Sequence, residues 1–185
     1  HPSASGLRIG GGIDITPENF DRARAHLGVY GLTPDLRQGD AENIGFPDVT
    51  FDVVYSNGVL HHVSDFPRAL RECRRVLRPE GTFWITVYNR NSIFYQISLV
   101  VFSHVLLGGF LRYSLKERLS MIEYTESKSR PIVNVYTQAE LREHLQAAGF
   151  DVDWILVRKL TLEDLPAASI LAPLYRLAPR SLLDA

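Results

Sequence analysis

The sequence predicts an α/β domain built on a mostly parallel sheet. Two observations support this prediction: short apolar segments rich in β-branched residues alternate with longer segments of helical spacing, and glycine or proline separates them. The 185 residues are 45% hydrophobic and 22% charged, which suits one globular domain with a hydrophobic core. We therefore expect a single domain over residues 1–185.

The chain is expected to begin with a strand, a helix and a second strand. The first strand covers residues 8–13, and the Thr-Pro-Glu sequence at 16–18 follows it. These three residues combine a capping hydroxyl, a proline at the first helical position and an acid at the positive end of the helix dipole. The helix should run to about Leu27, with a short strand at 36–38.

A buried central strand and a long amphipathic helix are expected next. Residues 51–55 form an apolar, β-branched run, and a loop at 56–63 follows it. A helix that starts at 65 or 66 would place six apolar residues on one stripe facing the sheet. They are Phe66, Ala69, Leu70, Cys73, Val76 and Leu77. Residues 79–81 should end this helix, and another strand is expected at 82–88.

Residues 89–135 interrupt the alternation and are interpreted as an inserted lid over the substrate. The insertion holds the uncharged segment 93–111 and a charged helix near 115–122. The uncharged segment is long enough to cross a membrane, but its polar residues and glycine pair disfavour a span, and contact with a membrane surface is an alternative to the lid. The pattern resumes with a capping box at 137–140, a helix, and a strand at 152–157.

Charge and cysteine content exclude several classes of protein. With 20 basic and 21 acidic residues, the chain has no strong field for nucleic acid. The single cysteine, Cys73, excludes a disulfide framework and a multi-thiolate metal site, and indicates a cytoplasmic protein. His61 and His62 are adjacent, but no cysteine or acid stands at ligand spacing from them, so we expect no metal.

Polar residues at the ends of the expected strands are the candidates for ligand binding, because ligands of parallel sheets bind there. Asp14 could accept hydrogen bonds from both hydroxyls of a ribose or could cap the following helix. Asp40, with Ala41, could contact an adenine or could form an Asx-turn. Asn57, in a small polar loop after the central strand, could approach the same ligand.

Several motifs occur in a familiar order. They are Gly12-Ile13-Asp14-Ile15-Thr16-Pro17-Glu18, Gly39-Asp40-Ala41-Glu42, Phe46-Pro47, the run from Phe51 to Val63, and Arg75-Val76-Leu77-Arg78-Pro79-Glu80-Gly81. Together they resemble the class I S-adenosylmethionine (SAM)-dependent methyltransferases of the UbiE-like methyltransferase-domain group. The resemblance covers residues 8–88 and returns at 136–158.

The resemblance implies a Rossmann-like sheet and SAM as the cofactor. It places Asp14 on the ribose, Ile15 against the adenine, Asp40 and Ala41 at the adenine edge, and Asn57 and the His61 region beside the methionine part and the methyl group. The family's glycine-rich loop is not found before Asp14, and Gly10-Gly11-Gly12 is interpreted as the start of a strand. No closing antiparallel strand is found either, so we expect a fragment truncated at both ends that can be inactive alone.

The resemblance implies methyl transfer to a small-molecule acceptor, which we expect to be largely apolar. It also favours the lid, because in related methyltransferases the stretch after the strand expected here at 82–88 shapes the acceptor pocket. Transfer depends mainly on alignment of the reactants, and a hydroxyl acceptor would also need a base. His62 is the first candidate for that base and His61 the second, since histidines ordinarily titrate near neutral pH; core or helix-end histidines are the alternative. A non-catalytic interaction domain is the alternative function. A nicotinamide-dependent dehydrogenase is disfavoured, because no Gly-x-Gly-x-x-Gly precedes a helix.

Overall fold

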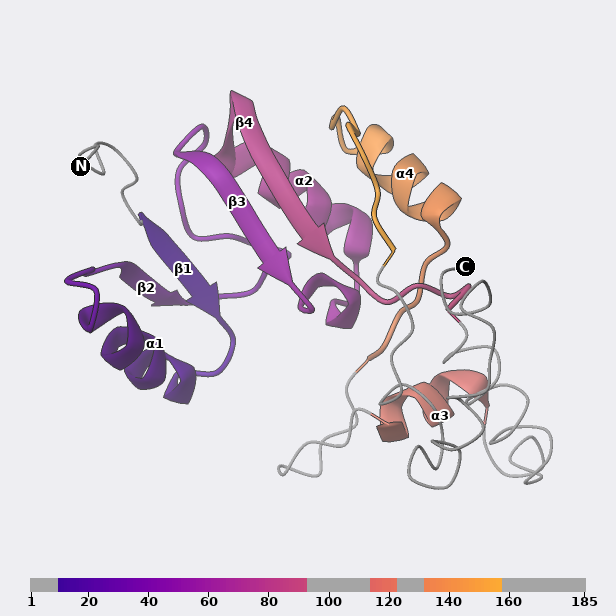
Figure 1. Cartoon of the computed structure of the whole chain (residues 1–185), viewed down its shortest axis with the longest axis horizontal. Coiled ribbons are helices and arrows are strands. Elements are labelled where there is room, and N and C mark those ends of the chain that lie inside the picture. The colour runs from indigo at the N-terminus through magenta and orange to yellow at the C-terminus, as the bar shows by residue number, and fades with distance from the viewer. Residues whose placement is uncertain (1–9, 93–113, 123–131, 158–185) are drawn as a thin grey trace, which may run out of the picture. The chain divides into compact units, whose positions relative to one another are not determined.

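The computed structural model describes residues 10–92, 114–122 and 132–157. It has two compact units, His1–Ile85 and Thr86–Ala185, which are treated separately below. The elements in chain order are β1 (Gly11–Asp14), α1 (Glu18–Gly28), β2 (Asp35–Gln38), β3 (Phe51–Asn57), the short 3-10 helix η1 (Leu60–His62), α2 (Phe66–Val76), β4 (Leu77–Thr86), α3 (Leu115–Ile122) and α4 (Gln138–Ala147) (Figure 1). This alternation of strands and helices confirms the predicted α/β class.

The strands of the first unit form two pairs. β1 lies parallel to β2, with Gly11 opposite Asp35 and Asp14 opposite Gln38. β3 is hydrogen-bonded to β4, and their arrows point the same way in Figure 1. Among the described residues the two pairs are separate sheets. Because β1 and β2 are parallel, their carboxyl ends meet at one edge, where ligands of parallel sheets bind.

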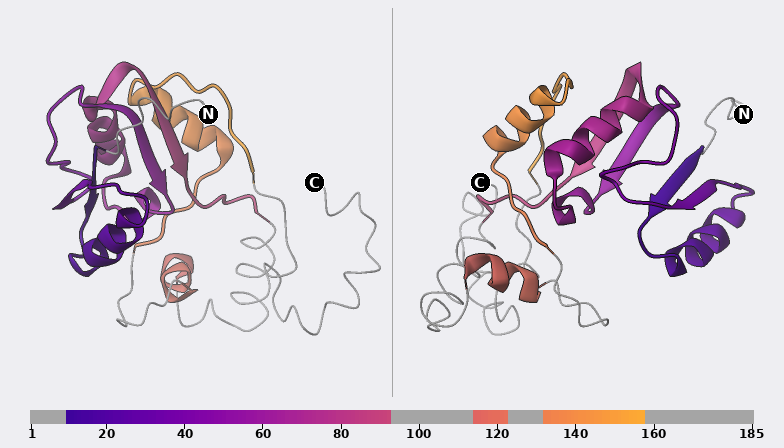
Figure 2. Two further views of the ribbon diagram at one scale, coloured as in Figure 1. Left: turned by 60° about the vertical axis from the view of Figure 1, so that its left-hand side comes forward. Right: turned by 180° about the vertical axis from the view of Figure 1, so that it is seen from behind.

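Helix α2 provides much of the buried core of the first unit. All six residues of the predicted stripe are buried, and Ala69 and Leu70 are fully inaccessible to solvent. The helix lies along one face of the β3–β4 pair (Figure 2). Its start is also as predicted, because the Asp65 side chain caps it by accepting a 2.9 Å hydrogen bond from the backbone N–H of Arg68.

Gly11 and Gly12 form part of β1, as predicted, and Gly10 directly precedes this strand. A Cβ atom on Gly11 would lie 2.5 Å from the Phe46 ring, and one on Gly10 would lie 2.9 Å from the Phe51 ring. The two rings are themselves packed edge to face, with centroids 5.0 Å apart. Glycine is needed here so that the backbone can approach these aromatic side chains.

Two predicted helix boundaries were wrong. Thr16 does not cap α1: the capping residue is Pro17, which makes no side-chain hydrogen bond, and the Asp14 carboxylate bonds the Thr16 backbone instead. In addition, α2 ends at Val76 and β4 begins at the next residue, so residues 79–81 belong to the strand and do not end the helix.

Two predictions about strands also need correction. β3 is not buried on both faces, since the side chains of Val53 and Tyr55 are 53% and 69% exposed. Its only strand neighbour among the described residues is β4. Residues 152–157 do not form a strand, and they have no ladder partner in the described part of the chain. An apolar segment needs such a partner to become a strand.

The second unit contains α3 and α4. α3 lies at the predicted residues 115–122. The capping box of α4 is confirmed: Thr137 Oγ1 accepts from the Glu140 N–H, and the Glu140 carboxylate accepts from the Thr137 N–H. Gly149, at a φ of 86°, follows the end of α4, where a left-handed glycine commonly ends a helix.

The segment predicted as a lid or membrane contact, residues 93–111, lies outside the described residues, as does the tail from 160. Within the described ranges, none of the helices combines the length and the apolar character needed to span a membrane.

Candidate functional site

Asp14 lies at the carboxyl end of β1 and is held in place by the start of α1. Its Oδ1 accepts a 2.7 Å hydrogen bond from the Thr16 N–H, and its Oδ2 accepts a 3.0 Å bond from Asn19 Nδ2. Neither bond caps α1, whose capping residue is Pro17 with no side-chain hydrogen bond, so the structure does not contain the helix cap that sequence reasoning offered as the alternative role of Asp14. A carboxylate has about four acceptor positions, so both oxygens keep capacity for a pair of ligand hydroxyls.

Asp40 lies at the same edge, because the ladder of β1 and β2 continues one residue beyond the strands. The Gly39 N–H donates a 3.0 Å bond to the Asp14 carbonyl, which places Asp40 next to the end of β1. Asp40 Oδ1 accepts from the Glu42 N–H at 2.9 Å, as in the Asx-turn considered above. Oδ2 accepts no hydrogen bond from the described residues, so it faces solvent or a ligand.

Apolar surface accompanies these carboxylates. Ile15, directly after β1, has 71% of its surface exposed, and Gln38 Nε2 holds its carbonyl at 3.2 Å. Ala41 is half-buried beside Asp40. Two acceptor side chains and an open aliphatic side chain at one edge are the features that a nucleoside requires. The residues present therefore fit the nucleoside part of SAM.

The histidine pair follows the end of β3. Asn57 is the last residue of β3, and Gly58 has a φ of 69°, a left-handed conformation that lets the chain turn into η1. His61 is fully buried, whereas His62 is half-buried, and their ring centroids are 4.0 Å apart. Of the two candidate bases, only His62 offers surface to an external molecule.

The loop after Asp40 is attached to α2 by residues that sequence reasoning missed. Arg75 donates to the carbonyls of Ile44 and Phe46 at 2.7 and 2.9 Å and pairs with Glu72 at 2.8 Å and Asp48 at 2.6 Å. Hydrogen bonds to Glu72 and Asp48 raise the pKa of Arg75, and the bond from Arg75 lowers the pKa of Glu72. The sequence alone shows only a row of arginines at helical spacing, which does not indicate these bonds.

Glu42 also fixes this loop. Its Oε1 accepts from the backbone N–H groups of Ser64 and Asp65 at 2.7 and 2.8 Å, and its carbonyl accepts from Arg68 Nε at 2.8 Å. In the sequence, only the position of Glu42 at the end of the Gly-Asp-Ala-Glu motif could have indicated that it fixes this loop. A carboxylate at the N-terminus of α2 is also favoured by the helix dipole.

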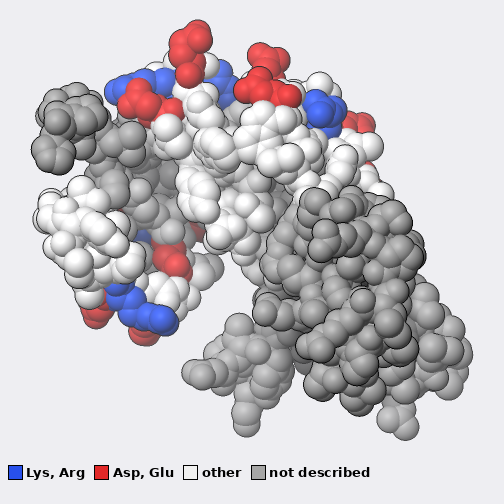
Figure 3. All heavy atoms as spheres, in the orientation of Figure 1, with Lys and Arg blue, Asp and Glu red and all other residues white. Residues whose placement is uncertain are grey.

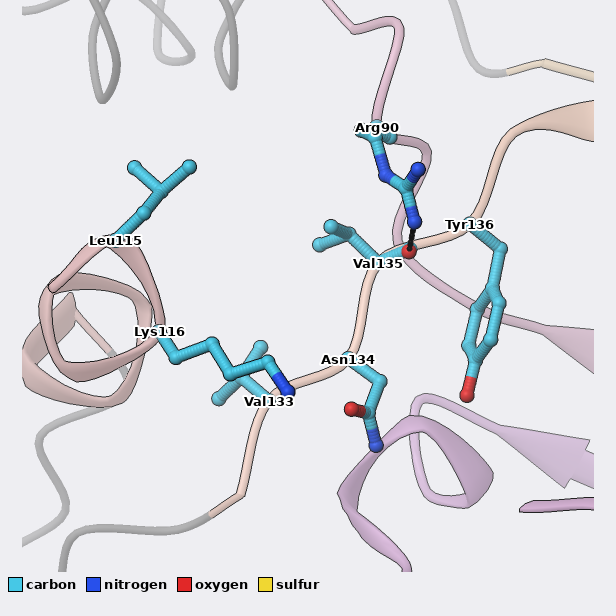
Figure 4. Close-up of a pocket in the computed structure, with 7 residues that line it drawn as sticks. All are labelled: Arg90, Leu115, Lys116, Val133, Asn134, Val135 and Tyr136. Carbon is cyan, nitrogen blue, oxygen red and sulfur yellow. Dashed lines mark hydrogen bonds between the residues drawn. The ribbon is translucent and has the colours of Figure 1, made fainter.

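The second unit contains a cavity of about 440 Å³, which is large enough for a small organic molecule. Figure 4 shows its lining: Arg90, Leu115, Lys116, Val133, Asn134, Val135 and Tyr136. Arg90 is engaged with Glu140 at 2.8 Å and with the Val135 carbonyl at 3.0 Å. Burial raises the pKa of Tyr136 to about 12, so its phenol is a neutral hydrogen-bond donor at neutral pH.

Charge does not single out any other site. Acidic and basic side chains are interspersed on the coloured part of the face in Figure 3. In the described ranges, no cluster of three or more histidine, cysteine or acidic residues is placed to hold a metal ion. Burial raises the pKa of the Cys73 thiol to about 12, so this thiol stays protonated and unreactive at neutral pH.

Comparisons with known proteins give a consistent result. The family model described as "Methyltransferase domain" matches residues 8–85. A ubiquinone biosynthesis O-methyltransferase from Azorhizobium caulinodans is 32% identical over 141 residues, which are 76% of this chain and 49% of that protein. The protein of the same name from Cereibacter sphaeroides (strain ATCC 17025) is 36% identical over 89 residues, which are 48% of this chain and 36% of that protein.

Solved structures agree on the fold. A SAM-dependent methyltransferase from Thermotoga maritima, described as a possible histamine N-methyltransferase, aligns with a TM-score of 0.54 at 20% identity, over 76% of this chain and 55% of that chain. A Bacillus halodurans protein described as a methyltransferase aligns with a TM-score of 0.55 at 21% identity. The alignment covers 82% of this chain and 58% of that chain. The chain spans about half or less of the length of the two ubiquinone-biosynthesis relatives.

Proposed function

We propose that the protein transfers a methyl group from SAM to a small molecule. Residues 8–85 match the methyltransferase domain family, and the fold is the Rossmann-like α/β fold of the solved methyltransferases it resembles. The observation that carries this proposal is the placement of Asp14 and Asp40 at adjoining strand ends, joined through the bond from Gly39 to the Asp14 carbonyl. A nucleoside can bind both carboxylates at this edge.

Each site residue is proposed to bind a different part of SAM. Asp14 would bind the ribose hydroxyls, Ile15 would pack on the adenine, and Asp40 with Ala41 would bind its edge. Asn57 would lie beside the methionine part. When bound, SAM supplies an activated methyl group on a good leaving group, so the protein accelerates transfer chiefly by alignment.

The half-buried His62 would accept the proton of a hydroxyl acceptor. The ring of the fully buried His61 lies 4.0 Å from that of His62, so His61 is better suited to support His62 than to contact the acceptor itself.

Calorimetric titration of the full-length protein tests the proposed cofactor. We expect saturable binding of SAM and none of a nicotinamide dinucleotide, since the fold lacks a dinucleotide fingerprint in the described residues. Binding of the nicotinamide cofactor alone would favour a dehydrogenase. Binding of neither would favour a non-catalytic domain, an alternative that the family match and the relatives' names do not favour.

We propose that the acceptor is small and largely apolar and that it occupies the 440 Å³ cavity. Leu115, Val133 and Val135 supply apolar lining, and Tyr136 adds an aromatic ring whose phenol is neutral. The side chain of Lys116 extends toward Asn134 in Figure 4, so a polar group of the acceptor could bind there.

Replacing Leu115 by aspartate tests the cavity. We expect the KM for the acceptor to rise about 10–100-fold, because burying a leucine side chain against a ligand is worth about 1.5–3 kcal/mol, while SAM affinity stays unchanged. The matched control is Leu156→Asp, at a position that is 81% exposed. Equal KM values for both variants would show that the acceptor binds elsewhere.

The location of the protein is proposed from its cysteine content. A single buried thiol with a raised pKa suits the reducing cytoplasm, because it neither forms an internal disulfide nor reacts readily. We expect no nucleic-acid partner, since the net charge is −1. Residues 93–111, which lie outside the described ranges, are proposed as a point of contact with a membrane surface.

A further inference from the structure

Glu42 joins two loops that the proposed reaction uses. Its carboxylate accepts the N–H groups of Ser64 and Asp65 at 2.7 and 2.8 Å through the same atom, Oε1. Glu42 lies two residues after Asp40, on the proposed adenine side. Ser64 lies two residues after His62. A single side chain therefore ties the cofactor loop to the segment that carries the proposed base.

The rest of the loop is attached to α2 without Glu42. The Ile44 N–H donates to Glu72 Oε2 at 2.8 Å, and Arg75 binds the carbonyls of Ile44 and Phe46. The loop should therefore keep its attachment to the helix when the Glu42 carboxylate is removed. What would be lost is the connection to Ser64 and Asp65, just after the histidines.

The bonds made by Glu42 lie at an exposed position. Water can replace the carboxylate at the Ser64 and Asp65 amides, so its loss should cost little stability. Water cannot hold the two loops at a fixed separation. The effect of Glu42 should therefore be on the alignment of the site more than on folding.

We propose that Glu42 is a positioning residue that sets the distance between the bound nucleoside and His62. This inference rests on the proposed function, because it assigns Asp40 to the cofactor and His62 to the acceptor. Glu42 itself contacts neither ligand. Misplacement of reacting groups by about 1 Å can lower a rate about 100-fold, so a tie of this kind can control turnover.

Three variants of the full-length protein test the proposal. Glu42→Ala removes the acceptor atom, Glu42→Asp retracts it by one methylene, and Glu42→Gln keeps an oxygen in the same place. We expect kcat at saturating substrates to fall about 10–100-fold for the alanine and aspartate variants. The glutamine variant should remain within about threefold of the wild type, because its amide oxygen can accept the same two bonds.

Hydrogen exchange provides a second readout that needs no turnover. The Ser64 and Asp65 amides should exchange faster in the alanine and aspartate variants and should stay protected in the glutamine variant. Asp48→Ala is the control, since Asp48 ties the same loop to α2 through Arg75 but has no bond to the histidine segment. It should change neither kcat nor the exchange of these two amides.

The possible outcomes test the positioning role of Glu42 and the proposed function separately. Wild-type kcat in both the alanine and aspartate variants would overturn the proposal, and so would an equal loss in Asp48→Ala. If the alanine variant does not fold, the contrast between aspartate and glutamine decides. Failure of the wild type to bind SAM would refute the proposed function, whereas unchanged exchange at Ser64 and Asp65 in the aspartate variant would refute the tie itself.

Discussion

Replacing His62 by alanine should lower turnover about 100-fold at neutral pH and leave SAM affinity unchanged. Positioned general bases typically contribute 100-fold or more, and the half-buried His62 is the candidate base that an acceptor can reach. The measurement is steady-state kcat over a range of pH, with SAM affinity from calorimetry. The deficit should shrink at high pH, where a hydroxyl acceptor ionises without help.

Two further histidine variants make this result interpretable. His26→Ala removes an exposed histidine whose ring packs on Tyr30 in the first unit, and it should keep wild-type turnover. His61→Ala should lower the melting temperature, because the His61 side chain is fully buried. A His62→Ala enzyme that keeps the wild-type rate at every pH would rule out the base.

The sequence was sufficient where one local pattern determined the structure. The stripe of α2 was predictable because five helical positions and Leu77 all face the core, and every one of them is buried. The capping box at Thr137 was predictable because its two bonds involve residues only three apart. Such features need no knowledge of distant residues.

Prediction failed where long-range contacts decided the structure. Residues 152–157 have an apolar, strand-like sequence, but no strand lies beside them in the described ranges, so no ladder forms. The start of β4 at Leu77 was missed because Pro79 and Gly81 resemble a turn when read locally.

The candidate site shows the same division. Asp14 and Asp40 could be proposed from their positions at expected strand ends, and the pairing of β1 with β2 now places them at one edge. Glu42 could not be given a role, because its partners, Ser64 and Asp65, lie more than 20 residues away in sequence. The bonds of Arg75 to Ile44 and Phe46 were missed for the same reason, since they are not visible in a helical wheel.

Asp14→Ala should weaken SAM binding about 10–100-fold, because a hydrogen bond to a charged group contributes about 1.5–3 kcal/mol. Asp40→Ala should have an effect of similar size on the adenine side. Asp14 also bonds Thr16 and Asn19, so the alanine variant should lose some stability as well. Titration calorimetry and thermal unfolding should be measured on the same samples.

Asp14→Asn separates the two roles of this residue. The asparagine oxygen can still accept from the Thr16 N–H, and the exposed Asn19 amide can turn its oxygen toward the new NH2 group, so the melting temperature should stay close to that of the wild type. The charge and one acceptor are lost, so SAM affinity should still fall about tenfold. Asp21→Ala is the matched control on α1, because its side chain is 90% exposed and pairs only with Arg24, at 3.4 Å, among the described residues. Wild-type SAM affinity in both Asp14 variants would show that the ribose is bound elsewhere, whereas a loss in Asp14→Asn with unchanged stability can only arise from contact with the ligand.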